Sequence, residues 1–164
     1  MNIPDFLESL TSQDWFIDRT PVDPSKTTID AQAKEKLNTA PAELRDFVCS
    51  FLECTNNDET IWFLSYQDYR DASYDIAHPW NTYEQQSIEY SDDDMHESIH
   101  AFWKDHIPFL MSVAGEYSYI AMGIGSENYG KIYQGFEPEY EEATLIAHNL
   151  FDFFHKFSKS LINF

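Results

Sequence analysis

Positively charged side chains are scarce in this sequence. It has 10 Lys and Arg residues against 29 Asp and Glu residues, which gives a formal net charge of -19 at pH 7 over 164 residues. Proteins that bind nucleic acid obtain much of their affinity from Lys and Arg side chains that neutralise phosphates. Anionic membrane surfaces likewise attract basic segments. The scarcity, with no basic run anywhere in the chain, argues against nucleic acid and against a membrane as partners.

Cysteines and long apolar runs are scarce too. The two cysteines, Cys49 and Cys54, lie five residues apart in a predicted helix, a spacing that suits neither a disulfide framework nor a zinc knuckle. No stretch reaches the ~18 apolar residues that a membrane helix needs. Residues 1–19 lack the cationic start and apolar run of a secretory signal. We therefore expect one cytoplasmic domain over residues 1–164, with reduced cysteines and no cofactor.

Aromatic residues, in contrast, are abundant. They make up 16% of the chain, and this load is typical of a folded protein and not of a disordered acidic tail. Apolar spacing and turn signals predict a loop over 72–81, helices over 3–10, 42–53, 92–106 (ended by Pro108) and 149–161, and strands over 60–66, 117–124 and 131–136. Strands and helices do not alternate regularly, which predicts an α+β fold. We expect a central, mostly antiparallel or mixed sheet, with helices packed on one face and helices at both chain ends.

One motif suggests metal chemistry. Residues 96–100 read His-Glu-Ser-Ile-His, the HExxH pattern in which two histidines on one helical face hold zinc and the glutamate activates water. His106 occupies the position of the third ligand in the longer HExxHxxGxxH signature, but Trp103 replaces its glycine. We expect the helix to continue through Trp103, so that His106 points away from His96 and His100. A zinc-dependent hydrolase therefore remains only an alternative function, and the main prediction includes no metal site.

Acidic clusters provide the main candidates for a binding surface. They are the triplet Asp92, Asp93 and Asp94 and the loop with Glu137, Glu139, Glu141 and Glu142, which has Tyr129 and Tyr140 nearby. Opposite electrostatic potentials accelerate association and suppress wrong partners, and aromatic residues inside a polar rim often dominate the binding energy. These residues predict a surface that binds a basic protein. The alternative is that they form a solvated surface that only maintains solubility.

Five short segments point to a family. They are residues 41–47 (PAELRDF), 107–109 (IPF), 115–119 (GEYSY), 130–133 (GKIY) and 146–153 (IAHNLFDF). Their order and spacing resemble those of the SUKH superfamily, the Smi/Knr-like immunity proteins of bacterial toxin systems, over residues 41–161. The sequence departs from that pattern at Ala40, where leucine is usual, and at Asn149, where a capping serine is usual. Residues 68–98 have no counterpart, so the resemblance does not explain the histidines.

The resemblance implies an α+β domain without catalytic residues that neutralises a toxin protein. Toxins of such systems are often nucleases with basic grooves, and an acidic protein is suited to occupy such a groove. We therefore expect a non-catalytic immunity protein that binds a basic toxin through its acidic surface. A regulatory scaffold is a further alternative, because relatives of this fold also occur as signalling or cell-wall regulators.

Overall fold

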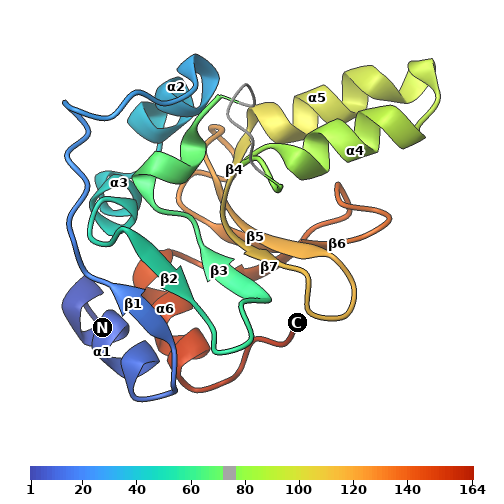
Figure 1. Cartoon of the computed structure of the whole chain (residues 1–164). Helices are drawn as coiled ribbons and strands as arrows, with labels where there is room; N and C mark the ends of the chain where they lie inside the picture. The colour runs from blue at the N-terminus through green and yellow to red at the C-terminus, as the bar shows by residue number, and fades with distance from the viewer. Residues whose placement is uncertain (72–76) are drawn as a thin grey trace.

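A seven-stranded sheet forms the centre of the computed structural model, which describes residues 1–71 and 77–164 (Figure 1). Its strands are β1 (Phe16–Asp18), β2 (Glu53–Thr55), β3 (Ile61–Phe63), β4 (His106–Ser112), β5 (Ser118–Gly123), β6 (Ile132–Phe136) and β7 (Thr144–Ala147). They lie in the sheet in chain order, and each pair of neighbours is antiparallel. The predicted α+β class and the antiparallel sheet are therefore confirmed.

Helices precede, interrupt and follow the sheet. Over the described residues they are α1 (Ile3–Thr11), α2 (Ala31–Thr39), α3 (Ala42–Val48), α4 (Thr82–Tyr90), α5 (His96–Lys104) and α6 (Leu150–Ser158), with 3-10 turns η1 (Tyr66–Tyr69) and η2 (Asp93–Met95). Polar side chains fix several starts: those of Asn2, Asp30 and Asn149 accept hydrogen bonds from backbone N–H groups in the first turn of α1, α2 and α6. Helices at both chain ends were predicted, and this prediction is confirmed.

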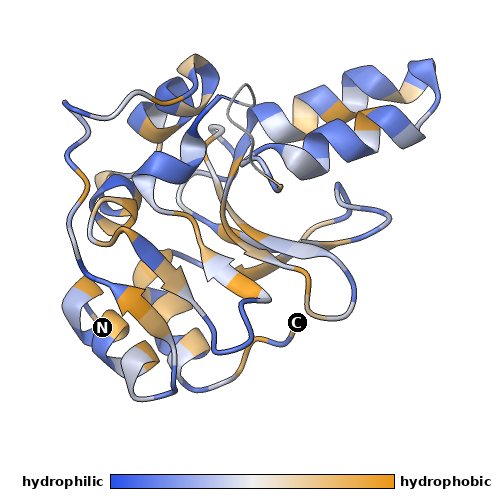
Figure 2. Cartoon of the chain, viewed as in Figure 1, coloured by the Kyte–Doolittle hydropathy of each residue, from blue (hydrophilic) through white to orange (hydrophobic). Residues whose placement is uncertain are grey.

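Aromatic side chains join one face of the sheet to α1, α3 and α6. The Phe63 ring on β3 lies 5.6 Å from the Phe6 ring on α1 and 5.4 Å from the Phe47 ring on α3. Phe157 on α6 is also 5.4 Å from Phe63, and Phe154 stacks on Phe6 at 4.1 Å. Burial of these rings stabilises the packing of the three helices on the sheet, and each ring pair adds ~0.5–1.5 kcal/mol. Figure 2 shows the apolar segments concentrated in the sheet and these helices.

The opposite face of the sheet carries α4 and α5. Successive residues of a strand point to opposite faces, so Tyr119 and Ile120 of β5 face different layers. Ile120 shares its face with Phe63 through the register Phe63–Leu110–Ile120. The Tyr119 ring lies 4.9 Å from Trp103 of α5 and 5.9 Å from the ring of Tyr83 on α4. The sequence predicted helices on one face, and the α4–α5 hairpin adds a layer on the other.

The α4–α5 hairpin extends beyond the sheet (Figure 1), and it lies within an excursion of the chain between two adjacent strands. β3 and β4 pair directly, and the Leu64 N–H donates to the Phe109 carbonyl at 2.9 Å just beyond their register. The chain between β3 and β4 therefore leaves the sheet and returns beside β3, where it forms β4. Figure 2 shows the hairpin as mostly hydrophilic, with few apolar positions.

Several boundaries differ from the predictions. The helix predicted over 42–53 ends at Val48, and Cys54 lies in β2. Pro108 does not end a helix but lies inside β4, where the register with β5 shifts between Pro108 and Leu110. A bulge accommodates proline because the ladder is already interrupted there. The predicted loop over 72–81 lies partly outside the described residues. None of the described helices has the length and apolar character needed to cross a bilayer.

Candidate functional site

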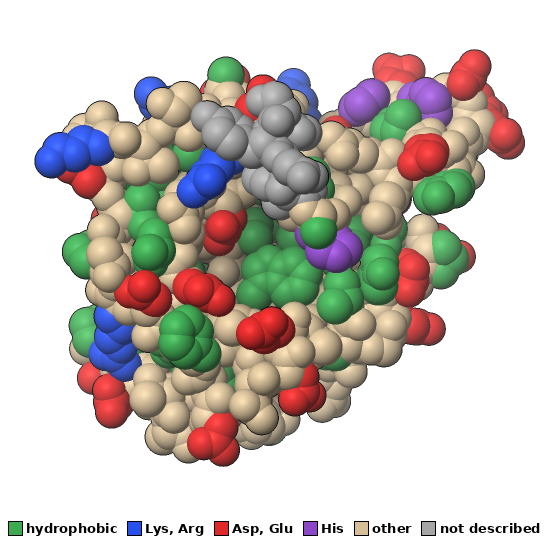
Figure 3. All heavy atoms as spheres, viewed as in Figure 1, with side chains coloured by type: hydrophobic (Ala, Val, Ile, Leu, Met, Phe, Trp, Pro, Cys, Tyr) green, Lys and Arg blue, Asp and Glu red, His purple; other side chains and the backbone are tan. Residues whose placement is uncertain are grey.

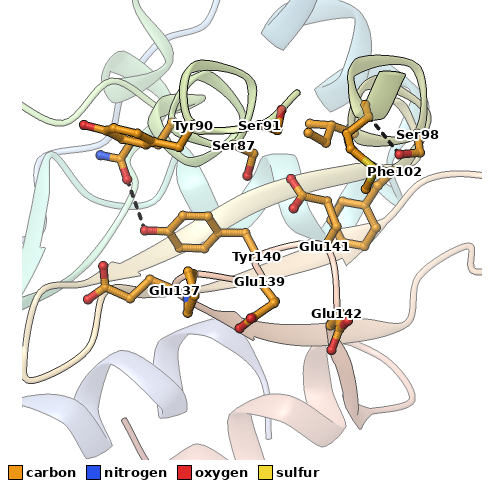
Figure 4. Close-up of a pocket in the computed structure, with 14 residues that line it drawn as sticks. Ser87, Tyr90, Ser91, Ser98, Phe102, Glu137, Glu139, Tyr140, Glu141 and Glu142 are labelled. Atoms are coloured by element: carbon orange, nitrogen blue, oxygen red, sulfur yellow. Dashed lines mark hydrogen bonds between the residues drawn. The ribbon is translucent and has the colours of Figure 1, made fainter. Parts of the chain in front are cut away.

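A hollow of about 580 Å³ lies between the α4–α5 hairpin and the loop that joins β6 to β7 (Figure 4). We call it the hairpin groove. One wall comes from α4, η2 and α5 and contains, among others, Ser87, Tyr90, Met95, Ile99 and Phe102. The other wall is the β6–β7 loop, with Glu137, Pro138, Glu139, Tyr140, Glu141 and Glu142. The groove thus combines segments that lie about 40 residues apart in the chain.

Buried aromatic residues fix the loop wall. The Tyr140 ring is stacked on Tyr83 of α4, with 4.6 Å between centroids, and its hydroxyl donates to Gln86 Oε1 at 3.1 Å. The Tyr140 carbonyl accepts a hydrogen bond from the Tyr119 hydroxyl. Burial raises the pKa of Tyr83, Tyr119 and Tyr140, so all three stay neutral and act as donors near neutral pH. The loop is therefore held in place before any ligand arrives.

Two of the loop carboxylates are also held by hydrogen bonds. The Trp103 indole N–H donates to Glu141 Oε1 at 2.8 Å, and the backbone N–H of Tyr117 donates to Glu137 Oε1 at 2.8 Å. Glu139 and Glu142, in contrast, are exposed. No Lys or Arg occurs among the described residues that line the groove. Its loop wall therefore presents an uncompensated negative charge to whatever enters.

The helical wall exposes apolar side chains near the hairpin turn. Tyr90 is 83% exposed and Met95 50% exposed, while Phe102 is partly buried against the His106 ring. The buried residues of α4 are Thr82 and Tyr83, and those of α5 are Ile99 and Trp103. Exposed apolar groups grouped on one surface are typical of an interaction site.

The structure brings together five of the nine predicted binding residues, namely Glu137, Glu139, Tyr140, Glu141 and Glu142. Asp92, Asp93 and Asp94 are exposed at the tip of the hairpin, between the lining residues Ser91 and Met95. Figure 3 shows acidic side chains at that end of the hairpin. Tyr129, 54% exposed, lies instead in the β5–β6 loop, at the other end of β6, so its expected place near the acidic loop is wrong.

Two further differences from the predictions concern residues of the groove. Tyr140 was predicted as an aromatic contact for a partner, but it is only 4% exposed and anchors the loop. Tyr90 was not predicted as a binding residue because the apolar stripe of α4 is too weak to be identified from the sequence. Met95 and Phe102 lie within the helix predicted over 92–106, but they were not assigned to a binding surface. The signal of Tyr90 and Met95 in the sequence is an aromatic or methionine residue among the polar residues of the hairpin turn.

The three histidines of the HExxH pattern do not converge. His96 Nε2 is 3.1 Å from the Ile88 carbonyl, and His100 Nδ1 is 3.1 Å from Glu84 Oε1. His106 lies not in the helix, as predicted, but at the start of β4, because α5 ends at Lys104. Nowhere in the described ranges do three or more His, Cys, Asp or Glu side chains form a group able to hold a metal ion. The geometry thus gives the zinc-hydrolase alternative no support.

The cysteines likewise show no activated nucleophile. Burial raises the pKa of Cys49 to about 11 and raises that of Cys54 still further. Both thiols therefore remain protonated near neutral pH, and only the thiolate is a strong nucleophile. Their place at the end of α3 and in β2 gives them a structural role.

Acid is expected to destabilise the fold through His106. Its Nδ1 donates to the Phe102 carbonyl at 2.7 Å, and its Nε2 accepts from the Asn128 amide at 3.1 Å. Burial lowers the pKa of His106 below its ordinary value of 6.5. The unfolded chain then binds the proton more readily, so the free energy of unfolding should fall as pH decreases below about 6.5, by at most ~1.4 kcal/mol per unit.

Urea unfolding of the wild type and of His106→Gln between pH 7.5 and pH 5 measures this contribution. The loss of stability on acidification should be smaller in His106→Gln, whereas His155→Gln, at an exposed position of α6, should follow the wild type. Equal pH dependence of the wild type and His106→Gln would contradict the assignment.

Comparisons of the chain with protein-family models, with curated proteins and with solved structures found no match. The class that the fold and the groove define is thus an antiparallel α+β domain with an acidic, apolar-walled groove.

Proposed function

We propose that this protein is a non-catalytic immunity protein that binds and neutralises a basic toxin protein in the cytoplasm. The observation that carries the proposal is the hairpin groove, where four glutamates and no Lys or Arg of the described lining meet exposed apolar side chains. An acidic surface with apolar contacts complements a basic protein surface. The resemblance of residues 41–161 to SUKH immunity proteins supports the same function.

The overall charge supports this proposal as well. A net charge of -19 generates a negative potential that attracts a basic protein over distances up to roughly 10 Å at ordinary salt concentrations. Nuclease toxins need positive charge to hold their own substrate, so they provide the complementary surface. Occupying that surface blocks the nucleic acid without any chemical step. The protein therefore acts by binding alone.

Co-expression tests the proposal directly. The probe is the product of the gene next to the one that encodes this protein, which the proposal predicts to be a toxin, produced in bacteria with and without this protein. We expect growth to be restored, a complex to form on size-exclusion chromatography, and the association rate constant to fall by about tenfold or more when salt is raised from 20 to 500 mM. Continued toxicity without a complex would reject the proposal.

A further inference from the structure

The hairpin groove has the composition of a site for an arginine side chain beside an apolar one. We infer that it receives a segment of the partner protein in which an arginine inserts between the two walls and a neighbouring apolar residue packs against the hairpin. This inference rests on the proposed function, since it names the part of the partner that is bound.

The loop wall provides the charge. Glu139 and Glu142 are exposed, and Glu141 lies between the Trp103 indole and the groove. A guanidinium group can bond two carboxylate oxygens at once, with a fork geometry that an ammonium group does not have. Because no cation of the described chain lines the groove, these carboxylates are available to a ligand.

The hairpin wall provides the flat, apolar contacts. Tyr90 and Phe102 present aromatic rings to the groove (Figure 4), and Met95 is half exposed at the hairpin turn. Guanidinium planes stack on aromatic faces, whereas the more strongly hydrated ammonium of lysine gains less from such a surface. The combination of an aromatic wall and a carboxylate wall therefore favours arginine.

Other occupants fit less well. A second copy of this chain would bring its own net charge of -19 against four glutamates. Nucleic acid would bring phosphates, which those carboxylates repel. A hollow of about 580 Å³ also lies in the ~300–1,000 Å³ range of pockets that enclose a small ligand, and thus suits one or two side chains. A short basic segment of a protein matches the size and the charge.

A matched pair of charge variants locates the contact. Glu139→Gln/Glu142→Gln removes two of the four carboxylate charges of the groove, and Glu35→Gln/Glu43→Gln removes the same charge from exposed positions of α2 and α3. Binding of each full-length variant to the toxin-like neighbour is measured by calorimetry. We expect the groove variant to weaken binding by about tenfold or more and the control by less than about threefold. Tyr90→Ala, at an 83% exposed position, should weaken binding by about tenfold and leave the fold intact.

Two results separate this inference from the proposed function. If the wild type forms no complex, the proposed function fails. If the wild type binds and both double variants weaken binding equally, the toxin contacts some other acidic surface, and the arginine-groove inference fails while the function stands.

Peptide titration tests the groove without the toxin. Acetyl-Leu-Arg-Leu-amide and acetyl-Leu-Lys-Leu-amide are titrated into isotope-labelled protein, and backbone amide shifts are followed by NMR. Saturable shifts at the hairpin turn and the β6–β7 loop, larger with the arginine peptide and absent in Glu139→Gln/Glu142→Gln, are expected. Shifts spread over the whole acidic surface, or equal responses to the two peptides, would overturn the inference.

Discussion

Replacing Phe63 by alanine is expected to lower the free energy of unfolding by about 3–5 kcal/mol. The side chain is 1% exposed, and its ring contacts rings on α1, α3 and α6, including those of Phe6, Phe47 and Phe157. Truncation removes a strand residue that touches all three helices through these rings and leaves a cavity that rigid neighbours fill only in part. Urea unfolding followed by tryptophan fluorescence measures the loss.

Phe16→Ala is the matched control, because it makes the same change at a 56% exposed position of β1. It should cost about 1 kcal/mol or less. A loss below about 1 kcal/mol in Phe63→Ala, with an unchanged denaturant slope, would show that the aromatic cluster does not join the helices to the sheet in the way described.

Replacing Lys36 by alanine is expected to cost about 2–4 kcal/mol. Its ammonium group is buried in α2, donates to the Trp103 carbonyl and to the His106 carbonyl at 3.3 Å, and lies 5.3 Å from the centre of the Trp80 ring. The Trp103 carbonyl belongs to the last turn of α5, where a positive charge is favourable. Burial lowers the pKa of Lys36, while the nearby carboxylates of Glu84, Asp105 and Asp30 favour its charged form.

Comparison of Lys36→Met with Lys36→Ala separates the contribution of the ammonium group to stability from that of the aliphatic stem, and Lys34→Ala is the control. Lys36→Met keeps the apolar stem and leaves the carbonyls without their donor, so it should cost about 1–3 kcal/mol. Lys34→Ala, at an exposed position of the same helix, should stay within about 0.5 kcal/mol of the wild type. Thermal unfolding gives all three values. A Lys36→Ala variant as stable as Lys34→Ala would contradict a structural role for the buried ammonium.

The sequence was most informative where apolar spacing and capping agree. The stripe with Phe154 and Phe157 and the cap at Asn149 predicted α6, which the structure confirms over Leu150–Ser158. α2 was missed because Lys36 occupies one of its buried positions, so that its stripe looks polar. β1 and β7 were missed because strands of three and four residues are too short to show alternation.

One wall of the candidate site could likewise be predicted from the sequence, and the other could not. Local composition was enough to find the acidic loop with Glu139 and Glu142 as one wall. The other wall depends on α4, whose buried residues Thr82 and Tyr83 give no amphipathic pattern, and on contacts between segments far apart in the chain. Tyr140 shows the limit of the approach, since an aromatic residue within an acidic loop looks exposed until its stacking partner Tyr83 is known.

The position of the α4–α5 hairpin has a consequence for how such a protein can acquire new partners. The chain leaves the sheet after β3 and rejoins it at β4, so the hydrogen-bonded ladder between these two strands is complete without the hairpin. Exposed residues of the hairpin, such as Tyr90 and Met95, can therefore be exchanged while the strands keep their register. One framework of strands can in this way carry many different recognition surfaces, each altered at little risk to folding.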